Sequence, residues 1–151
     1  MKRALDIGTG NGAYLLELYQ RGYFPTGIDK RDWVLPENVK VARQEGIVKI
    51  IIMDALTYLE SCTERFNLVS IRYPDELAFY LFAPHREALD FLEKVHKVLE
   101  IDGVLEITSR IQDFPYKDII DTVEKSGYFE KTELEFFCLG NNYTVRFRKK
   151  I

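Results

Sequence analysis

The stretch Ala4-Leu5-Asp6-Ile7-Gly8-Thr9-Gly10-Asn11-Gly12 decides how this chain folds. An apolar strand carries an acid near its end, and three glycines then follow at every second position. Directly after them, apolar side chains recur at helical spacing, namely Leu15, Leu16, Leu18 and Tyr19. A strand, a glycine loop and a helix in this order bring bare backbone close to a ligand. The start of the helix offers free N–H groups to a carboxylate or a phosphate.

The spacing of the three glycines favours a ligand that carries positive charge. The dinucleotide fingerprint reads G-x-G-x-x-G, whereas this chain reads D-x-G-x-G-x-G, with Asp6 on the strand. A carboxylate at that position repels a pyrophosphate and attracts a cation. Two alternatives stay open here: a nicotinamide-dependent oxidoreductase, which the spacing disfavours, and a glycine-rich turn that binds nothing.

Length and composition bound the class of protein. The 151 residues, 46% of them hydrophobic, suffice for one globular domain over 1–151. No apolar run reaches membrane-spanning length and no secretion signal is present, so we expect a cytoplasmic protein that does not contact membranes. A net charge of −3 argues against a dedicated nucleic-acid binder. It does not exclude a local basic patch, for which the tail residues Arg146, Arg148, Lys149 and Lys150 and the group Arg72, His85 and Arg86 are the candidates.

Strand-like and helix-like segments alternate along the chain, which indicates an α/β domain with a largely parallel sheet. The first strand is expected to begin almost at Met1 and to end at Ile7, and further strands are expected over 26–29, 47–53, 66–72 and 104–108, with the third one buried. Helices are expected over 13–21, 36–46, 55–59, 85–100 and 118–125. The helix over 85–100 should face the core with Ala88, Leu89, Leu92, Val95 and Leu99. A terminal hairpin is expected over 132–139 and 143–148, joined through Gly140, Asn141 and Asn142.

Two expected strands end in an acid. Asp29 lies about twenty residues past the glycine loop, the interval at which a carboxylate accepts from ribose hydroxyls in this type of fold. Asp54 follows the third strand and can accept from the exocyclic amine of adenine, with Met53 and Ala55 beside the ring. The alternatives are a solvated acid at position 29 and a helix cap at position 54. Trp33 is interpreted as a packing residue.

Tyr73-Pro74-Asp75 comes directly after the fourth strand. Ligands of open α/β sheets bind beyond the carboxyl ends of the strands, near the switch in strand order, which strands one and four should flank. We therefore expect Asp75 and Arg72 to be the catalytic residues. The alternative is an ordinary surface turn.

The strand, acid and glycines of 4–12 resemble motif I of the class I S-adenosylmethionine-dependent methyltransferases, which also finish with an antiparallel hairpin. The resemblance implies a Rossmann-like, doubly wound, mostly parallel seven-stranded sheet with a C-terminal antiparallel hairpin. It also implies S-adenosylmethionine, a sulfonium without phosphate, as cofactor. The expected cofactor-binding residues are Asp6, Gly8, Gly10, Gly12, Asp29, Lys30, Asp54, Ala55 and Arg72.

Within that superfamily the chain looks most like the tRNA (guanine-N7)-methyltransferases. The matching features are the loop over 5–12, Tyr73-Pro74-Asp75 against F-P-D-P-W, Thr108 against a T-D pair, and 132–135 against T-x-x-E. The chain departs from the family at Glu76, Leu77 and Ser109. The resemblance implies tRNA or another RNA as partner. No metal is expected, because the sequence has no carboxylate–histidine cluster, and a monomer or small homo-oligomer is expected. The substrate-binding residues it implies are Tyr73, Pro74, Asp75, Thr108, Thr132 and Glu135.

The implied reaction is an in-line displacement of a sulfonium methyl by a nucleophile such as guanine N7, which has a lone pair and needs no deprotonation. Catalysis then rests on positioning and charge complementarity, with Asp75 orienting the acceptor. The alternative is a binding module that keeps the cofactor pocket and has lost the acceptor site. The departures from the family motif at Glu76 and Leu77 suggest this alternative.

Overall fold

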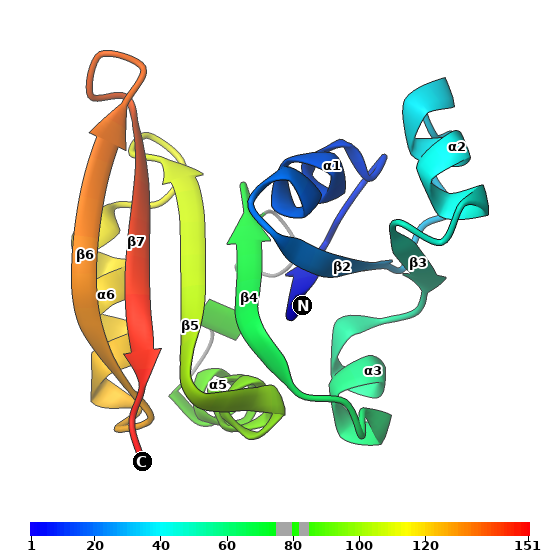
Figure 1. Ribbon diagram of the computed structural model, residues 1–151. Coiled ribbons are helices and arrows are strands. Elements are labelled where there is room, and N and C mark those ends of the chain that lie inside the picture. The colour runs from blue at the N-terminus through cyan, green and yellow to red at the C-terminus, as the bar shows by residue number, and fades with distance from the viewer. Residues whose placement is uncertain (75–79, 82–84) are drawn as a thin grey trace.

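A computed structural model shows a seven-stranded sheet with the order β3-β2-β1-β4-β5-β7-β6 (Figure 1). The structure describes residues 1–74, 80–81 and 85–151. The strands β1 to β5 run parallel, whereas β7 runs antiparallel to both of its neighbours. The expected fold class, a Rossmann-like sheet that ends in an antiparallel hairpin, is confirmed. The strands are β1 (Lys2–Ile7), β2 (Tyr23–Asp29), β3 (Lys49–Ile52), β4 (Phe66–Arg72), β5 (Leu99–Arg110), β6 (Phe129–Phe137) and β7 (Asn142–Lys149).

Helices cover both faces of the sheet, and the side chains of β1 pack against helices on each face. Ala4 packs with α1 (Ala13–Gln20) and α2 (Glu37–Gln44), whereas Leu5 and Ile7 belong to the larger cluster beneath the opposite face. That cluster includes buried side chains of α3 (Ala55–Ser61), α5 (His85–Val98) and α6 (Tyr116–Lys125). Side chains alternate along a strand, so a strand covered on both faces is mostly apolar, and in β1 the buried Asp6 is the exception. Within the described residues, every helix is too short or too polar to cross a lipid bilayer.

The third strand differs from its expectation. It covers only Lys49–Ile52 and lies at the edge of the sheet, so it is not the buried strand that its apolar run predicts. Ile52 is 43% exposed. A strand at the edge of a sheet has one neighbouring strand instead of two, and the hydrophobic pattern of the sequence does not distinguish an edge strand from a central one.

The fifth strand and the helix before it also differ in their bounds. The helix ends at Val98 and β5 starts at Leu99, well before the expected residue 104. A register shift between Phe66 and Leu68 lets the long strand pair with β4. On α5, Phe91 and Val98 are buried and Leu89 is only partly buried, which corrects the expected stripe.

The hairpin turn lies earlier than expected. The left-handed backbone falls on Cys138, Leu139 and Gly140, and Asn142 already belongs to β7. Along β7, Tyr143, Val145 and Phe147 are completely buried, whereas Arg146 is half-buried and Arg148 is exposed. The tip therefore contains two non-glycine residues at positive φ, which short loops rarely use.

The glycine loop sits at the switch point of the sheet, between β1 and β4. Its third glycine, Gly12, has a φ of 80° and precedes α1. A Cβ atom at this position would lie 2.9 Å from Cγ1 of Val39 and 3.1 Å from Cδ1 of Ile50. The close approach of the loop to α2 and β3 therefore depends on the missing side chain.

We predict that Gly12→Ala lowers the free energy of unfolding by about 2–4 kcal/mol, because left-handed backbone strain and overpacking add. Gly22→Ala is the matched control, since Gly22 has a φ of 94° but no heavy atom within 4 Å of the added carbon. The control should lose only about 1–2 kcal/mol. Urea unfolding measures both, and equal losses would contradict the close packing at Gly12.

Candidate functional site

A cavity of about 370 Å³ opens at the carboxyl ends of β1, β2 and β3. Its volume falls within the range of small-molecule sites. Residues expected to bind a cofactor line it, namely Gly8, Gly10, Asp29, Lys30, Asp54 and Ala55. The other three expected positions, Asp6, Gly12 and Arg72, are not part of the lining. The cofactor-binding roles themselves stay predictions.

Asp29 is held by backbone amides at the tip of β2. Its Oδ2 atom accepts from the N–H of Gly10 at 2.9 Å, and its Oδ1 atom accepts from the N–H of Arg31 at 3.0 Å. Each carboxylate oxygen has a second lone pair available. The side chain can therefore accept from two ligand hydroxyls without giving up the bonds that orient it.

Asp54 caps the N-terminus of α3, which confirms the helix cap that was the alternative to adenine binding. Its Oδ2 atom accepts from the N–H of Thr57 at 3.3 Å and from the Thr57 hydroxyl at 3.4 Å. Its Oδ1 atom accepts no hydrogen bond from a described residue, and Asp54 lines the cavity. Capping and ligand binding are thus compatible, one on each oxygen.

Aromatic and apolar side chains form the walls of the cavity, and the sequence predicted only some of them. Met53 and Ala55 line the cavity as expected beside an adenine ring. Trp33 also lines it and is 45% exposed, so it is not a fully buried packing residue. A tryptophan in a polar turn four residues after Asp29 was the signal that could have identified it. Tyr80 is a further wall residue, and nothing in its sequence context indicated this.

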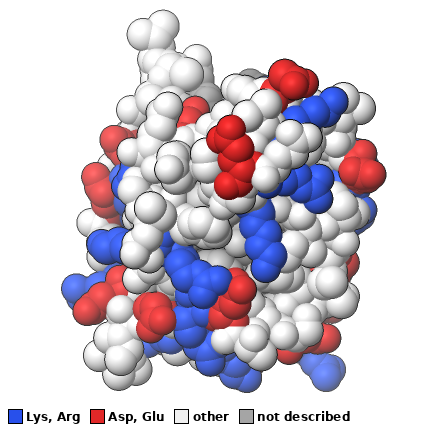
Figure 2. Space-filling model, turned by 45° about the vertical axis from the view of Figure 1, so that its right-hand side comes forward, with Lys and Arg blue, Asp and Glu red and all other residues white. Residues whose placement is uncertain are grey.

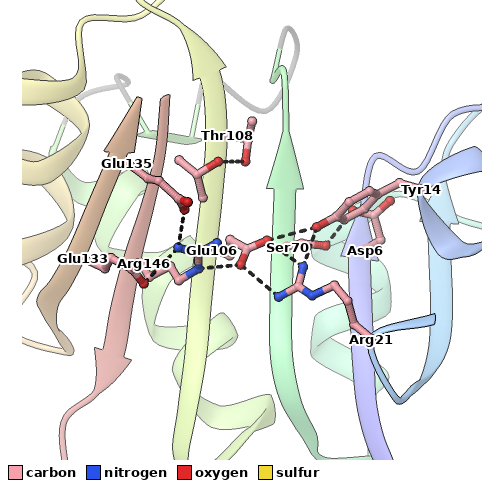
Figure 3. Close-up of polar contacts among 10 residues, drawn as sticks. Asp6, Tyr14, Arg21, Ser70, Glu106, Thr108, Glu133, Glu135 and Arg146 are labelled. Carbon is pink, nitrogen blue, oxygen red and sulfur yellow. Dashed lines mark hydrogen bonds and ion pairs between the residues drawn. The ribbon is translucent and has the colours of Figure 1, made fainter. Parts of the chain in front are cut away.

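The motif acid Asp6 lies beneath the loop, on the sheet face that α1 covers (Figure 3). It is 3% exposed and accepts from the Ser70 hydroxyl at 2.7 Å. Burial raises the pKa of Asp6 to about 6, although the Ser70 hydroxyl and the charge of Arg72 act in the opposite direction.

Glu106 is the centre of a charged row on the same face (Figure 3). It accepts from the Tyr14 hydroxyl at 3.0 Å and from Nε of Arg146 at 2.9 Å, and it pairs with Arg21 at 3.4 Å. Burial raises the pKa of Glu106, but the two arginines outweigh burial and hold it below its usual value. A carboxylate that is only 3% exposed therefore remains charged.

The basic tail is not a free cationic patch, which corrects that expectation. Arg146 pairs with Glu133 at 2.9 Å and with Glu135 at 2.8 Å, in addition to Glu106. Arg148 pairs with Glu130, and the Lys149 ammonium donates to the carbonyl of Leu99. Figure 2 shows basic and acidic side chains interspersed over the face that it displays. In the other expected patch, Arg86 is exposed and the His85 side chain lies outside the described residues.

Among the described residues that are expected to bind substrate, Tyr73 lines the cavity, and Pro74, Thr108, Thr132 and Glu135 do not. Thr108 is buried and hydrogen-bonded to Thr144 at 2.8 Å, Thr132 bonds the carbonyl of Arg146, and Glu135 is paired. Pro74 is buried, and Asp75 lies outside the described residues. Roles in substrate binding stay predictions for all of them.

Tyr73 and Arg72 connect the cavity with the charged row. Tyr73 has a φ of 49°, donates its N–H to the carbonyl of Thr108 at 2.7 Å, and accepts from Nδ2 of Asn142 at 2.9 Å. The guanidinium carbon of Arg72 lies 3.9 Å from the centre of the Tyr14 ring and 5.5 Å from that of Tyr73. Among the described residues, no group of three or more His, Cys, Asp or Glu side chains is placed to hold a metal ion.

We predict that Asp6→Asn removes a pH dependence from the stability of the protein. The pKa of Asp6 is about 6 in the fold against 3.8 for the free side chain, so the acid is most favourable below pH 3.8. Its contribution is lost as the pH rises through 6, which costs the wild type roughly 3 kcal/mol at pH 7.5. The amide oxygen of asparagine still accepts from Ser70.

Denaturant unfolding at pH 4.5 and 7.5 measures this difference, which should favour Asp6→Asn progressively at the higher pH. Asp32→Asn is the control, because Asp32 is exposed. Parallel pH profiles of the wild type and Asp6→Asn would contradict a raised pKa at Asp6.

Comparisons with known proteins find similarity in the fold but none in the sequence. No protein-family model and no curated protein sequence matches this chain. Solved structures match it over 99% of its length. The 1,6-didemethyltoxoflavin-N1-methyltransferase of Burkholderia thailandensis, with bound S-adenosylhomocysteine, has a TM-score of 0.74 at 16% identity over 72% of that chain. The N-methyltransferase NodS of Bradyrhizobium japonicum WM9, also with S-adenosylhomocysteine, has a TM-score of 0.66 at 17% identity over 79% of that chain.

A third match is the magnesium protoporphyrin IX methyltransferase of Synechocystis PCC 6803 with bound S-adenosylmethionine, with a TM-score of 0.69 at 14% identity over 70% of that chain. Their acceptors differ widely, and the identities are low, so the likeness establishes the fold alone. The chain has the Rossmann-like fold of the class I S-adenosylmethionine-dependent methyltransferases.

Proposed function

We propose that this protein binds S-adenosylmethionine in the cavity and transfers its methyl group to an acceptor. The observation that carries the proposal is the convergence of the glycine loop, Asp29 and Asp54 on one cavity beside the switch point. The likeness of the fold to methyltransferases that hold this cofactor or its product supports it.

The groups present in the cavity fit this cofactor. The spare lone pairs of Asp29 suit the two ribose hydroxyls, and the Oδ1 atom of Asp54, which accepts from no described residue, suits an exocyclic amine. Gly10 has open space where a Cβ atom would lie, so a ligand can approach its backbone. When bound, the cofactor supplies a methyl group on a sulfonium.

For the acceptor we favour a nucleic-acid base, with guanine N7 of tRNA as the first candidate. Support comes from the likeness of the loop over 5–12 and of Tyr73-Pro74-Asp75 to that family. Guanine N7 needs no general base, so the protein would act by orienting the acceptor and excluding water. Tyr73 stands at the cavity wall, where it can position a planar acceptor.

A catalytically inactive binding module is the second candidate. It is favoured by the ion pairs of Arg146 and Arg148, which leave these side chains unavailable to phosphates. The departures from the family motif at Glu76 and Leu77, which lie outside the described residues, also favour this candidate. This candidate predicts cofactor binding without methyl transfer.

We predict that Asp29→Ala weakens binding of S-adenosylmethionine and S-adenosylhomocysteine by about 1.5–3 kcal/mol, because hydrogen bonds to a charged group are lost. Isothermal titration calorimetry measures this. Asp32→Ala is the matched control, because Asp32 is an acid three residues further that does not line the cavity. Unchanged affinity of a folded Asp29→Ala variant would remove Asp29 from the site.

We expect radiolabelled S-adenosylmethionine to label one fraction among total RNA, DNA, protein and small metabolites, with RNA as the expected acceptor. The label should fall strongly with Asp29→Ala at subsaturating cofactor and stay unchanged with Asp32→Ala. Label in another fraction would reject the RNA acceptor. Tight cofactor binding with no label in any fraction would favour the binding module.

A further inference from the structure

The guanidinium of Arg72 lies close to two aromatic rings, and its hydrogen-bond donors have no partner among the described residues. The ring of Tyr14 lies 3.9 Å from its central carbon, and the ring of Tyr73 lies 5.5 Å away. Within residues 1–74, 80–81 and 85–151, the guanidinium makes no hydrogen bond and no ion pair. Stacking uses the π faces of a guanidinium and leaves the N–H groups at its edge free for a planar anion.

The two tyrosines are fixed before any ligand binds. The Tyr14 hydroxyl donates to Glu106, which Arg21 and Arg146 hold in place. Tyr73 is anchored to two other strands, by its N–H to β5 and by its hydroxyl to Asn142 of β7. The guanidinium is therefore preorganised, and little conformational entropy is lost when it binds an anion.

The position of Arg72 separates it from the cofactor cavity. Tyr73 lines the cavity, but neither Arg72 nor Tyr14 does, so the guanidinium lies next to a wall residue without being part of the lining. On the side of Tyr14 the face of β5, β7 and β6 is not covered by a described helix, as Figure 1 shows. A molecule that approaches over this face meets Arg72 and the cavity mouth together.

We propose that Arg72 binds an oxyanion, a phosphate or a carboxylate, of the methyl acceptor, and thereby sets which atom of the acceptor faces the cavity. This inference rests on the proposed function and adds a substrate class to it: the acceptor is an anion. Bidentate contact with a planar guanidinium recognises both groups. The charge of Glu106 does not oppose the anion, because two arginines already balance it.

The test follows the Nε–Hε NMR signals of arginine while inorganic phosphate is titrated into protein saturated with S-adenosylhomocysteine. The signal of Arg72, identified by its absence in Arg72→Gln, should shift and saturate. Arg65→Gln is the matched control, since Arg65 is exposed before the start of β4 and its guanidinium donates to the carbonyl of Glu64. Thermal stabilisation by phosphate should require about tenfold more phosphate in Arg72→Gln and be unchanged in Arg65→Gln.

An Arg72 signal that stays still, or drifts linearly with salt as that of Arg65 does, would overturn the proposal. So would a shift that phosphate causes only without S-adenosylhomocysteine, because the carboxylate of the cofactor product would then occupy the guanidinium. Acetate in place of phosphate separates the two oxyanions. A short RNA that displaces phosphate far better than a nucleoside monophosphate identifies a polynucleotide as the source. Calorimetry with S-adenosylhomocysteine is independent of these signals, so failure of the proposed function is seen separately.

Discussion

Three successive amides of the glycine loop bind the tip of β2, and the site depends on these bonds. The N–H groups of Gly8 and Thr9 both donate to the carbonyl of Ile28 at 2.9 Å, and that of Gly10 donates to Asp29. The loop therefore turns toward β2 instead of continuing over β4. This leaves the carboxyl ends of three strands facing one cavity, and it orients Asp29 by the same bonds that hold the loop. The glycines of the loop adopt positive φ without the steric strain that a side chain would cause, which permits the turn.

The half of the sheet beyond β4 is stabilised differently. On the face of α1, its strands present a row in which Ser70, Glu106 and Arg146 occupy paired positions on adjacent strands. Glu106 is the buried charge of this row, and it is balanced by both Arg21 and Arg146, so loss of both arginines would leave it unpaired at a cost far above the net value of the pairs. The row also explains how the C-terminal hairpin affects the site, because Arg146 of β7 fixes Glu106, and Glu106 fixes Tyr14 of α1.

Much of the cavity was predictable, because it depends on where strands end. The apolar runs and the acids after them placed Asp29 and Asp54 at one edge of a parallel sheet, and their distance along the chain did not matter. The partners of Arg146 were not predictable in this way. They depend on the register of a hairpin whose turn falls at Cys138 instead of Asn141, and on a pairing with β5 across 40 residues. Trp33 was missed for a related reason, since packing and ligand contact look alike in a sequence.

The position of Asp6 shows how a motif acid acts on a cavity that it does not line. The amides of the loop point to β2, so they do not neutralise Asp6, and Ser70 gives its carboxylate one neutral donor. A buried carboxylate with so few partners leaves a negative potential beneath the loop when it is ionised, in a region of low dielectric. Arg72 and Asp6 attract each other, yet the guanidinium stacks on Tyr14 and forms no ion pair with the acid. The loop thus lies between an acid on one side and a cavity on the other, an arrangement that disfavours a pyrophosphate and favours a cation.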